Sequence, residues 1–227
     1  MKDFGVKPPR NDGTIGIALK RCGIAAAVFA VILAPLSASA QGRPEKEKTL
    51  SIKLTTRAPD PDKWNSGTAS NGTVRIFTCK PHACPDPVTV AFFVQKGAVT
   101  PPSDPALERF ASIDLPKTIE AATAALAAKT GVTEKVETLA SAPAKLKGYP
   151  SALNETKLTG GNPSPVYVDI GVIFVGPILI RVESRSPSRE LAQKSLNEFV
   201  DVMDVVEMPP SEKPVPRTPS AKPEKKP

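Results

Sequence analysis

The sequence has a single histidine, His82, and aromatic residues make up only 5% of its 227 residues. Catalysis by a serine or cysteine nucleophile usually needs a nearby base, most often histidine. Proteins that bind single-stranded nucleic acid use aromatic side chains on which the bases stack. The glycine-rich phosphate-binding motifs and the His-Glu-x-x-His zinc motif are also missing. The sequence therefore predicts no nucleic-acid partner, and no motif in it predicts a catalytic residue, a cofactor or a metal ion.

No apolar run in the chain is long enough to cross a membrane. The longest, over residues 24–36, has about 13 residues and contains Pro35, whereas a spanning helix needs about 20. Lys20 and Arg21 precede it, and this order of basic and apolar residues is typical of a cleavable signal peptide. A short buried helix of the fold is the alternative interpretation.

The residues after the apolar run predict the site of cleavage. Ala38 and Ala40 are small at the two positions that a signal peptidase inspects, so Gln41 would become the new N-terminus. We interpret residues 1–40 as a signal peptide with an extended N-terminal region, and a translation start near Leu19 would make it more compact. The sequence thus predicts a periplasmic or secreted protein with no stable membrane span after cleavage.

Most of the excess positive charge lies at the two ends of the chain. The net charge is +7, yet residues 41–208 hold 20 basic against 19 acidic residues, unlike a nucleic-acid-binding domain. We interpret residues 41–48 as a charged linker and residues 49–208 as a single domain. Residues 209–227 are rich in Pro, Lys and Ser and are predicted to be a disordered tail, either merely solubilising or binding an anionic envelope polymer.

Two cysteines remain once the signal peptide and its Cys22 are removed. Cys79 and Cys84 are separated by four residues in a proline-containing loop, so we predict that they form a disulfide in an oxidising compartment. The alternative is a metal or redox protein, or an enzyme, centred on Cys79, His82 and Cys84. That group supplies at most three metal ligands, and redox dithiols are normally two residues apart.

Carboxylates are scattered along the chain. A pair such as Asp169 and Glu183 could meet in the folded protein. Most such pairs lie on solvated faces, so this pair alone does not predict an enzyme.

Alternation of apolar and polar residues predicts that the domain is mostly strand. Trp64 falls in an Asn/Ser/Gly-rich loop, and Arg181 and Glu183 are expected to point outward from the last strand. Helices are predicted to open at Asp104, at Asp114 and near Ser186–Glu190, the last ending before Pro209. The predicted strands cover residues 50–54, 74–79, 88–95, 132–139, 149–158, 166–175 and 178–183.

This order of elements predicts an α+β fold, an antiparallel β-sheet flanked by helices. Three short segments fit this order of elements: residues 147–152 (Lys-Gly-Tyr-Pro-Ser-Ala), 181–184 (Arg-Val-Glu-Ser) and 189–192 (Arg-Glu-Leu-Ala). With them, residues 49–208 resemble the PsbP-like superfamily, which includes extrinsic photosystem subunits, a Ran-binding nuclear-transport factor and bacterial exported or lipid-anchored proteins. The resemblance implies an α/β/α sandwich without shared catalytic residues, acting as a binding or assembly module.

These observations favour an exported, non-enzymatic protein. We hypothesise that it binds an envelope protein or another envelope component through one face of its sheet.

Overall fold

The computed structural model describes residues 51–69, 74–96 and 101–208. The predicted signal peptide with its cleavage site at Ala40 and Gln41, the predicted charged linker over residues 41–48, and the predicted tail over residues 209–227 lie outside the described residues. No helix within the described ranges is both long enough and apolar enough to cross a membrane.

A seven-stranded antiparallel sheet forms the centre of the fold, with the strand order β2-β3-β4-β8-β7-β6-β5. This architecture confirms the predicted α+β fold. Each of its hydrogen-bonded strand pairs is antiparallel, including β3 and β4, which the cysteine-containing loop connects. The strands are β2 (Trp64–Thr68), β3 (Val74–Cys79), β4 (Thr89–Lys96), β5 (Lys135–Leu146), β6 (Tyr149–Thr159), β7 (Val166–Val175) and β8 (Ile178–Ser186).

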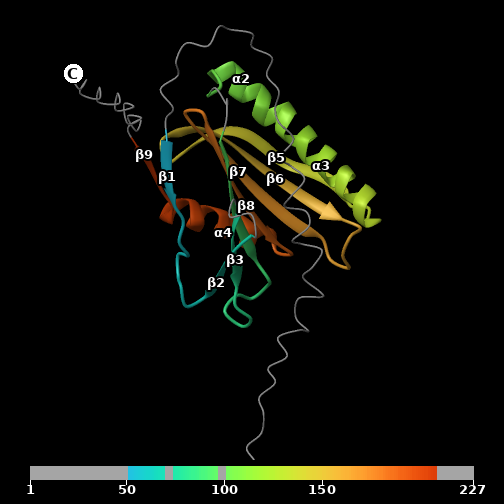
Figure 1. Ribbon diagram of the computed structural model, residues 1–227. Helices are drawn as coiled ribbons and strands as arrows, with labels where there is room; N and C mark the ends of the chain where they lie inside the picture. The colour runs from blue at the N-terminus through green and yellow to red at the C-terminus, as the bar shows by residue number, and fades with distance from the viewer. Residues whose placement is uncertain (1–50, 70–73, 97–100, 209–227) are drawn as a thin grey trace, which may run out of the picture.

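Helices pack on both faces of this sheet (Figure 1). On one face, α2 (Asp104–Arg109), a π-helical turn (Phe110–Asp114) and α3 (Leu115–Thr130) run continuously over the β5–β6 side. On the other face, α4 (Arg189–Val202) crosses β7 and β8. The side chain of Ser188 caps α4 by accepting a hydrogen bond from the Leu191 backbone N–H, close to the predicted start.

Alternate residues of the central strands serve the two cores. In β7, Val168 and Ile170 belong to the core that α2 and α3 cover, whereas Ile173 and Val175 belong to the core under α4. The core under α4 centres on Phe199, which has no exposed surface. Its ring lies 4.7 Å from that of Trp64, 4.9 Å from that of Phe77 and 6.1 Å from that of Phe92, measured between centroids.

Trp64 departs from its predicted place in a loop. It begins β2, lies opposite Cys79 in β3, and is only 7% exposed. The local Asn/Ser/Gly composition favours a loop, but burial of the indole against Phe199 outweighs that preference because a large aromatic surface leaves water. The prediction was therefore wrong because tertiary packing overrides local composition here.

The end of the domain also differs from the prediction. Helix α4 ends at Val202 instead of continuing toward Pro209, and Met203 has extended backbone angles and no exposed surface. A further strand follows, β9 (Asp204–Met208), which pairs antiparallel with β1 (Ser51–Thr55) in a separate two-stranded sheet. Pairing with β1 satisfies backbone groups that would otherwise need a continued helix.

Strand β5 was predicted over residues 132–139 but spans Lys135–Leu146, at the edge of the sheet. It continues through Pro143, a residue that an edge strand tolerates since one side of its backbone needs no partner. The β5–β6 hairpin closes through Lys147 and Gly148, whose φ angles of 55° and 85° match a two-residue turn of type I′.

Candidate functional site

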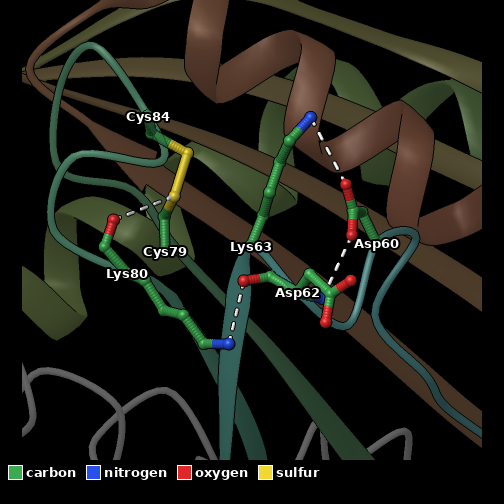
Figure 2. The surroundings of a disulfide bond; sticks show 6 residues. All are labelled: Asp60, Asp62, Lys63, Cys79, Lys80 and Cys84. Carbon is green, nitrogen blue, oxygen red and sulfur yellow. Dashed lines mark hydrogen bonds and ion pairs between the residues drawn. A yellow bond between two sulfur atoms is a disulfide. The ribbon is translucent and has the colours of Figure 1, made fainter.

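The two cysteines of the predicted disulfide are joined in the structure (Figure 2). Cys79 is the last residue of β3 and is 7% exposed, and Cys84 lies in the loop that leads to β4. His82 is exposed on this loop and has a φ of 70°, in the left-handed region. The loop therefore presents its only imidazole to solvent, beside two sulfur atoms that are bonded to each other.

The loop is also tied to the segment that precedes β2. The Lys80 ammonium donates hydrogen bonds to the backbone carbonyl oxygens of Asp62, at 2.8 Å, and Pro61, at 3.4 Å. Figure 2 shows the Lys80 side chain reaching back to this segment, next to the ion pair between Lys63 and Asp60. Across the described ranges, no three His, Cys, Asp or Glu side chains are grouped so that they could hold a metal ion. The disulfide and the Lys80 hydrogen bonds hold the loop against the rest of the domain.

Asp169 and Glu183, the carboxylates that could have met, lie on opposite faces of the sheet. In the β7–β8 register Asp169 is opposite Ser184, and Glu183 is opposite Ile170. Directly opposed residues share a face, so Asp169 faces α4 and Glu183 faces away from it. Neither carboxylate is solvated, because Asp169 is 5% and Glu183 1% exposed.

Glu183 belongs to a buried ion cluster on β8, defined by Arg181, Glu183 and Arg185. The prediction that Arg181 and Glu183 point into solvent was wrong, since Arg181 is only 6% exposed and its guanidinium carbon lies 3.9 Å from the centroid of the Phe93 ring. Arg185 Nε donates a hydrogen bond to Glu183, and Arg181 Nη2 lies 3.7 Å from Glu183 Oε2. Burial alone would raise the pKa of Glu183, but Arg185 and Arg181 outweigh it and hold that pKa below its usual range.

A cavity of about 230 Å³ lies on the other face, between α4 and strands β5, β6 and β7. We call it the α4 cavity. It exists because α4 packs over β7 and β8, while the neighbouring part of β5 presents only the short side chains of Ala140 and Ala142. Leu153 and Leu196 supply apolar walls. The cavity is therefore a consequence of where α4 crosses the sheet and of small residues beside it.

Two carboxylates lie together in the floor of the α4 cavity. Glu155 in β6 and Asp169 in β7 are directly opposite in the antiparallel register, and both are buried. Arg189, at the start of α4, donates from Nε to Glu155 Oε1 and from Nη2 to Oε2 at 2.8 Å. This two-point contact engages both oxygens of Glu155 and leaves Asp169 as the second negative charge.

Asp169 is the perturbed group of the cavity. Burial, followed by repulsion from Glu155, raises the pKa of Asp169 to about 7, and Arg189 only partly opposes these effects. Its Oδ2 atom is buried and has no hydrogen-bond partner, and the buried hydroxyl of Ser184, directly opposite in β8, lacks one too. Buried polar atoms are nearly always paired, so the unpaired carboxylate oxygen of Asp169, which lines the cavity, marks a position where a donor group can bind.

The rim of the α4 cavity is polar and open to solvent. Gln193 and Asn197 are exposed, and their spacing of four residues places them on one side of α4. The cavity thus combines a buried acidic floor, two apolar walls and an amide-bearing rim. Such a concave surface with a few convergent polar groups is the usual form of a ligand-binding site.

The sequence pointed to Asp169 only indirectly, and the roles of Glu155 and Arg189 were missed. A single carboxylate within the apolar run of residues 166–175 is the signal that singles out Asp169. Glu155 gives no such signal, because it is one of several polar residues in β6. Only the β6–β7 register brings it opposite Asp169. Arg189 was interpreted simply as part of the helix start.

A second hollow of about 380 Å³ lies between the β1–β9 sheet and the β5–β6 hairpin. Two of its polar side chains already have partners beside the hollow: Lys147 Nζ donates to the Asp201 backbone oxygen at 2.9 Å, and the Tyr149 hydroxyl donates to Glu207 at 3.3 Å. Burial and the nearby Glu207 carboxylate raise the pKa of Tyr149. Because Lys147 and Tyr149 already have hydrogen-bond partners, this hollow is a weaker candidate than the α4 cavity.

Replacing Asp169 by asparagine tests the perturbed carboxyl. A carboxyl whose pKa is higher in the folded than in the unfolded protein favours folding at low pH, and that contribution is lost as the pH rises toward 7. We therefore expect Asp169→Asn to match the wild type near pH 4 and to be more stable by about 4 kcal/mol at pH 8.5. Urea unfolding at both pH values measures this difference. An equal difference at the two values would contradict the raised pKa.

Comparisons with known proteins match this chain through its fold alone. No protein-family model and no curated protein sequence matches it. Among solved structures it is similar to PsbP from the cyanobacterium Synechocystis, with a TM-score of 0.46 and 10% identity over 76% of this chain and 100% of that one. It is also similar to LpqN, a protein involved in cell envelope biogenesis of Mycobacterium tuberculosis, with a TM-score of 0.41 and 12% identity over 68% of this chain and 84% of that one.

Proposed function

We propose that this chain is an exported, non-catalytic binding module that acts in the periplasm or outside the cell. The α4 cavity carries the proposal, because it is a concave site with a buried carboxylate oxygen that lacks a partner. The ligand of the cavity is an envelope component or part of one. Residues 49–208 form the single domain that binds it. The tail over residues 209–227 solubilises the chain or adds contacts with an anionic polymer.

Two observations support the location. Basic residues, an apolar run and Ala38-Ser39-Ala40 follow one another in the order of a signal peptide. The bond between Cys79 and Cys84 belongs to a class that persists in oxidising compartments and is rare in the cytosol. The same bond disfavours the alternative centred on Cys79, His82 and Cys84, since a disulfide sulfur is not a thiolate ligand or nucleophile.

Expression of the full chain in a Gram-negative host tests the location and the disulfide together. We expect the periplasmic fraction to contain a chain that begins at Gln41, because cleavage follows Ala40. Intact mass should rise by two hydrogens on reduction, and a Cys79→Ser variant should show no such rise. Peptides from residues 1–40 in the isolated protein, or thiols that react without a reductant, would contradict the proposal.

Retention of an envelope component on the purified chain tests the binding site. We expect the wild type to retain a component that Asp169→Asn loses, because the variant removes the acidic floor of the α4 cavity. Asp201→Asn is the matched control. Asp201 is an exposed carboxylate on α4 and does not line the cavity. Equal retention by the wild type and Asp169→Asn would exclude the cavity. A chain that lacks residues 209–227 separates the contribution of the tail.

A further inference from the structure

We propose that the α4 cavity binds an ammonium group carried on a short chain. This inference rests on the proposed function and adds the chemistry of the ligand. The ammonium would bind against Asp169, while its carbon chain would pass between Leu153 and Leu196 toward the open rim.

The unpaired oxygen of Asp169 requires a hydrogen-bond donor. Asp169 is 5% exposed, lines the cavity and has a buried Oδ2 atom without a partner. Leaving a buried acceptor unpaired costs about 1–3 kcal/mol, and more for a charged group. An ammonium has three donors and no acceptor, so it can donate to the unpaired Asp169 oxygen. The carboxylate oxygen therefore selects a donor ligand.

The charges around the cavity favour a cation. Glu155 from β6 and Asp169 from β7 contribute two negative charges, and Arg189 from α4 contributes one positive charge, both of whose contacts go to Glu155. The residues that β5 contributes to the lining are uncharged, as is Ser184 opposite Asp169 in β8. With Asp169 ionised, one negative charge remains uncompensated, and an anion would be repelled by it.

The size and walls of the cavity limit the ligand to a short chain. Its volume of about 230 Å³ lies below the roughly 300–1,000 Å³ typical of sites for drug-sized ligands. At the rim, the side-chain amides of Gln193 and Asn197 offer carbonyl oxygens as further acceptors. The same ammonium chemistry can come from a free alkylamine, from a lysine-type side chain, or from the N-terminus of a peptide.

Calorimetric titration of the purified, processed protein with three probes tests the inference and separates these sources. The probes are butylammonium chloride, Nα-acetyl-lysine amide and alanyl-alanine amide, with butanol as the uncharged control. We expect binding of at least one of the two alkylammonium probes at pH 8.5 and none of butanol. Alanyl-alanine amide is titrated at pH 7, because its α-amino group has a pKa of about 8 and would be largely neutral at pH 8.5. Because Asp169 must be ionised, affinity should fall about 30-fold at pH 5.5, which follows from a pKa of about 7.

Two variants and one control make the titration decisive. Asp169→Asn should weaken binding at least tenfold, and Asp201→Asn should leave it unchanged. Ala142→Leu provides a second variant at an exposed edge position; its larger side chain should fill the cavity and also weaken binding at least tenfold. Circular dichroism of each variant verifies that it is folded.

The possible failures of the two proposals can be told apart. If no ammonium probe binds the wild type at pH 8.5, or if Asp169→Asn binds it equally well, the ammonium inference is overturned. Should the wild type still retain an envelope component that Asp169→Asn loses, the cavity remains the binding site and its ligand has a different chemistry. If no ammonium probe binds and the wild type and Asp169→Asn also retain envelope components equally, the inference and the proposed function are both overturned.

Discussion

Replacement of Glu183 by glutamine is expected to lower the free energy of unfolding by about 3–5 kcal/mol. Glu183 is 1% exposed, and its carboxylate accepts a hydrogen bond from Arg185 and pairs with Arg181. Glutamine keeps the shape of the side chain but removes its charge, so the Arg181 guanidinium stays buried with less compensation. Removal of one partner from a buried ion cluster is costly because the remaining charge has already lost its water.

The pH dependence of this effect has a definite sign. Because the pKa of Glu183 is lower in the folded than in the unfolded protein, its contribution is present at neutral pH and is lost as the pH falls through the folded-state pKa. The difference between the wild type and Glu183→Gln should therefore shrink in acid. Urea unfolding at pH 7 and at pH 3 measures both differences.

An exposed ion pair supplies the control for Glu183. Lys194 and Glu198 lie 3.9 Å apart on α4, with side chains that are 67% and 44% exposed. Such surface pairs are screened by water and salt, so Glu198→Gln should change the free energy of unfolding by less than about 0.5 kcal/mol. If the two variants are equally stable, the buried cluster contributes little and our account of β8 is wrong.

Replacement of Phe199 by alanine is the second change with a large expected effect, a loss of about 3–5 kcal/mol of stability. The Phe199 ring is fully buried and lies within 4.7 Å of the Trp64 ring and 4.9 Å of the Phe77 ring, between centroids. Alanine removes these contacts and leaves a cavity where α4 meets the sheet. Because α4 carries Arg189 and the rim of the α4 cavity, ligand binding should weaken as well.

Tryptophan fluorescence makes the Phe199→Ala result specific. Trp64 is the only tryptophan in the chain and packs edge-on against Phe199, so its emission should move to longer wavelength as water reaches the indole. Guanidinium unfolding gives the change in stability. Val206→Ala is the control, because Val206 is 52% exposed and should lose less than about 0.5 kcal/mol. An unchanged emission in a folded Phe199→Ala variant would contradict the packing described.

Local sequence patterns were sufficient for much of the fold. The alternation of apolar and polar residues located most strands of the main sheet, and the proline and capping residues located α3 and the start of α4. These elements are determined by residues close to one another in the chain. Trp64 and residues 204–208 were missed because their conformation depends on partners far away, Phe199 and β1 respectively.

The buried Glu183 shows what a local sequence pattern cannot predict. Alternation along β8 correctly separates Ile180 and Val182 from Arg181 and Glu183, but the sheet is buried on both faces, so the polar side is not a solvated side. Solvent exposure depends on what covers each face, and a period of two residues carries no such information.

The amino-acid sequence alone was enough to place Cys79 and Cys84 in one short loop, but it named Asp169 only as a carboxylate that could meet Glu183. Tertiary structure decided the rest of the α4 cavity: the β6–β7 register sets Glu155 beside Asp169, and the crossing of α4 brings Arg189 onto Glu155. Such contacts depend on strand neighbours and helix placement, which are determined by the packing of the whole core.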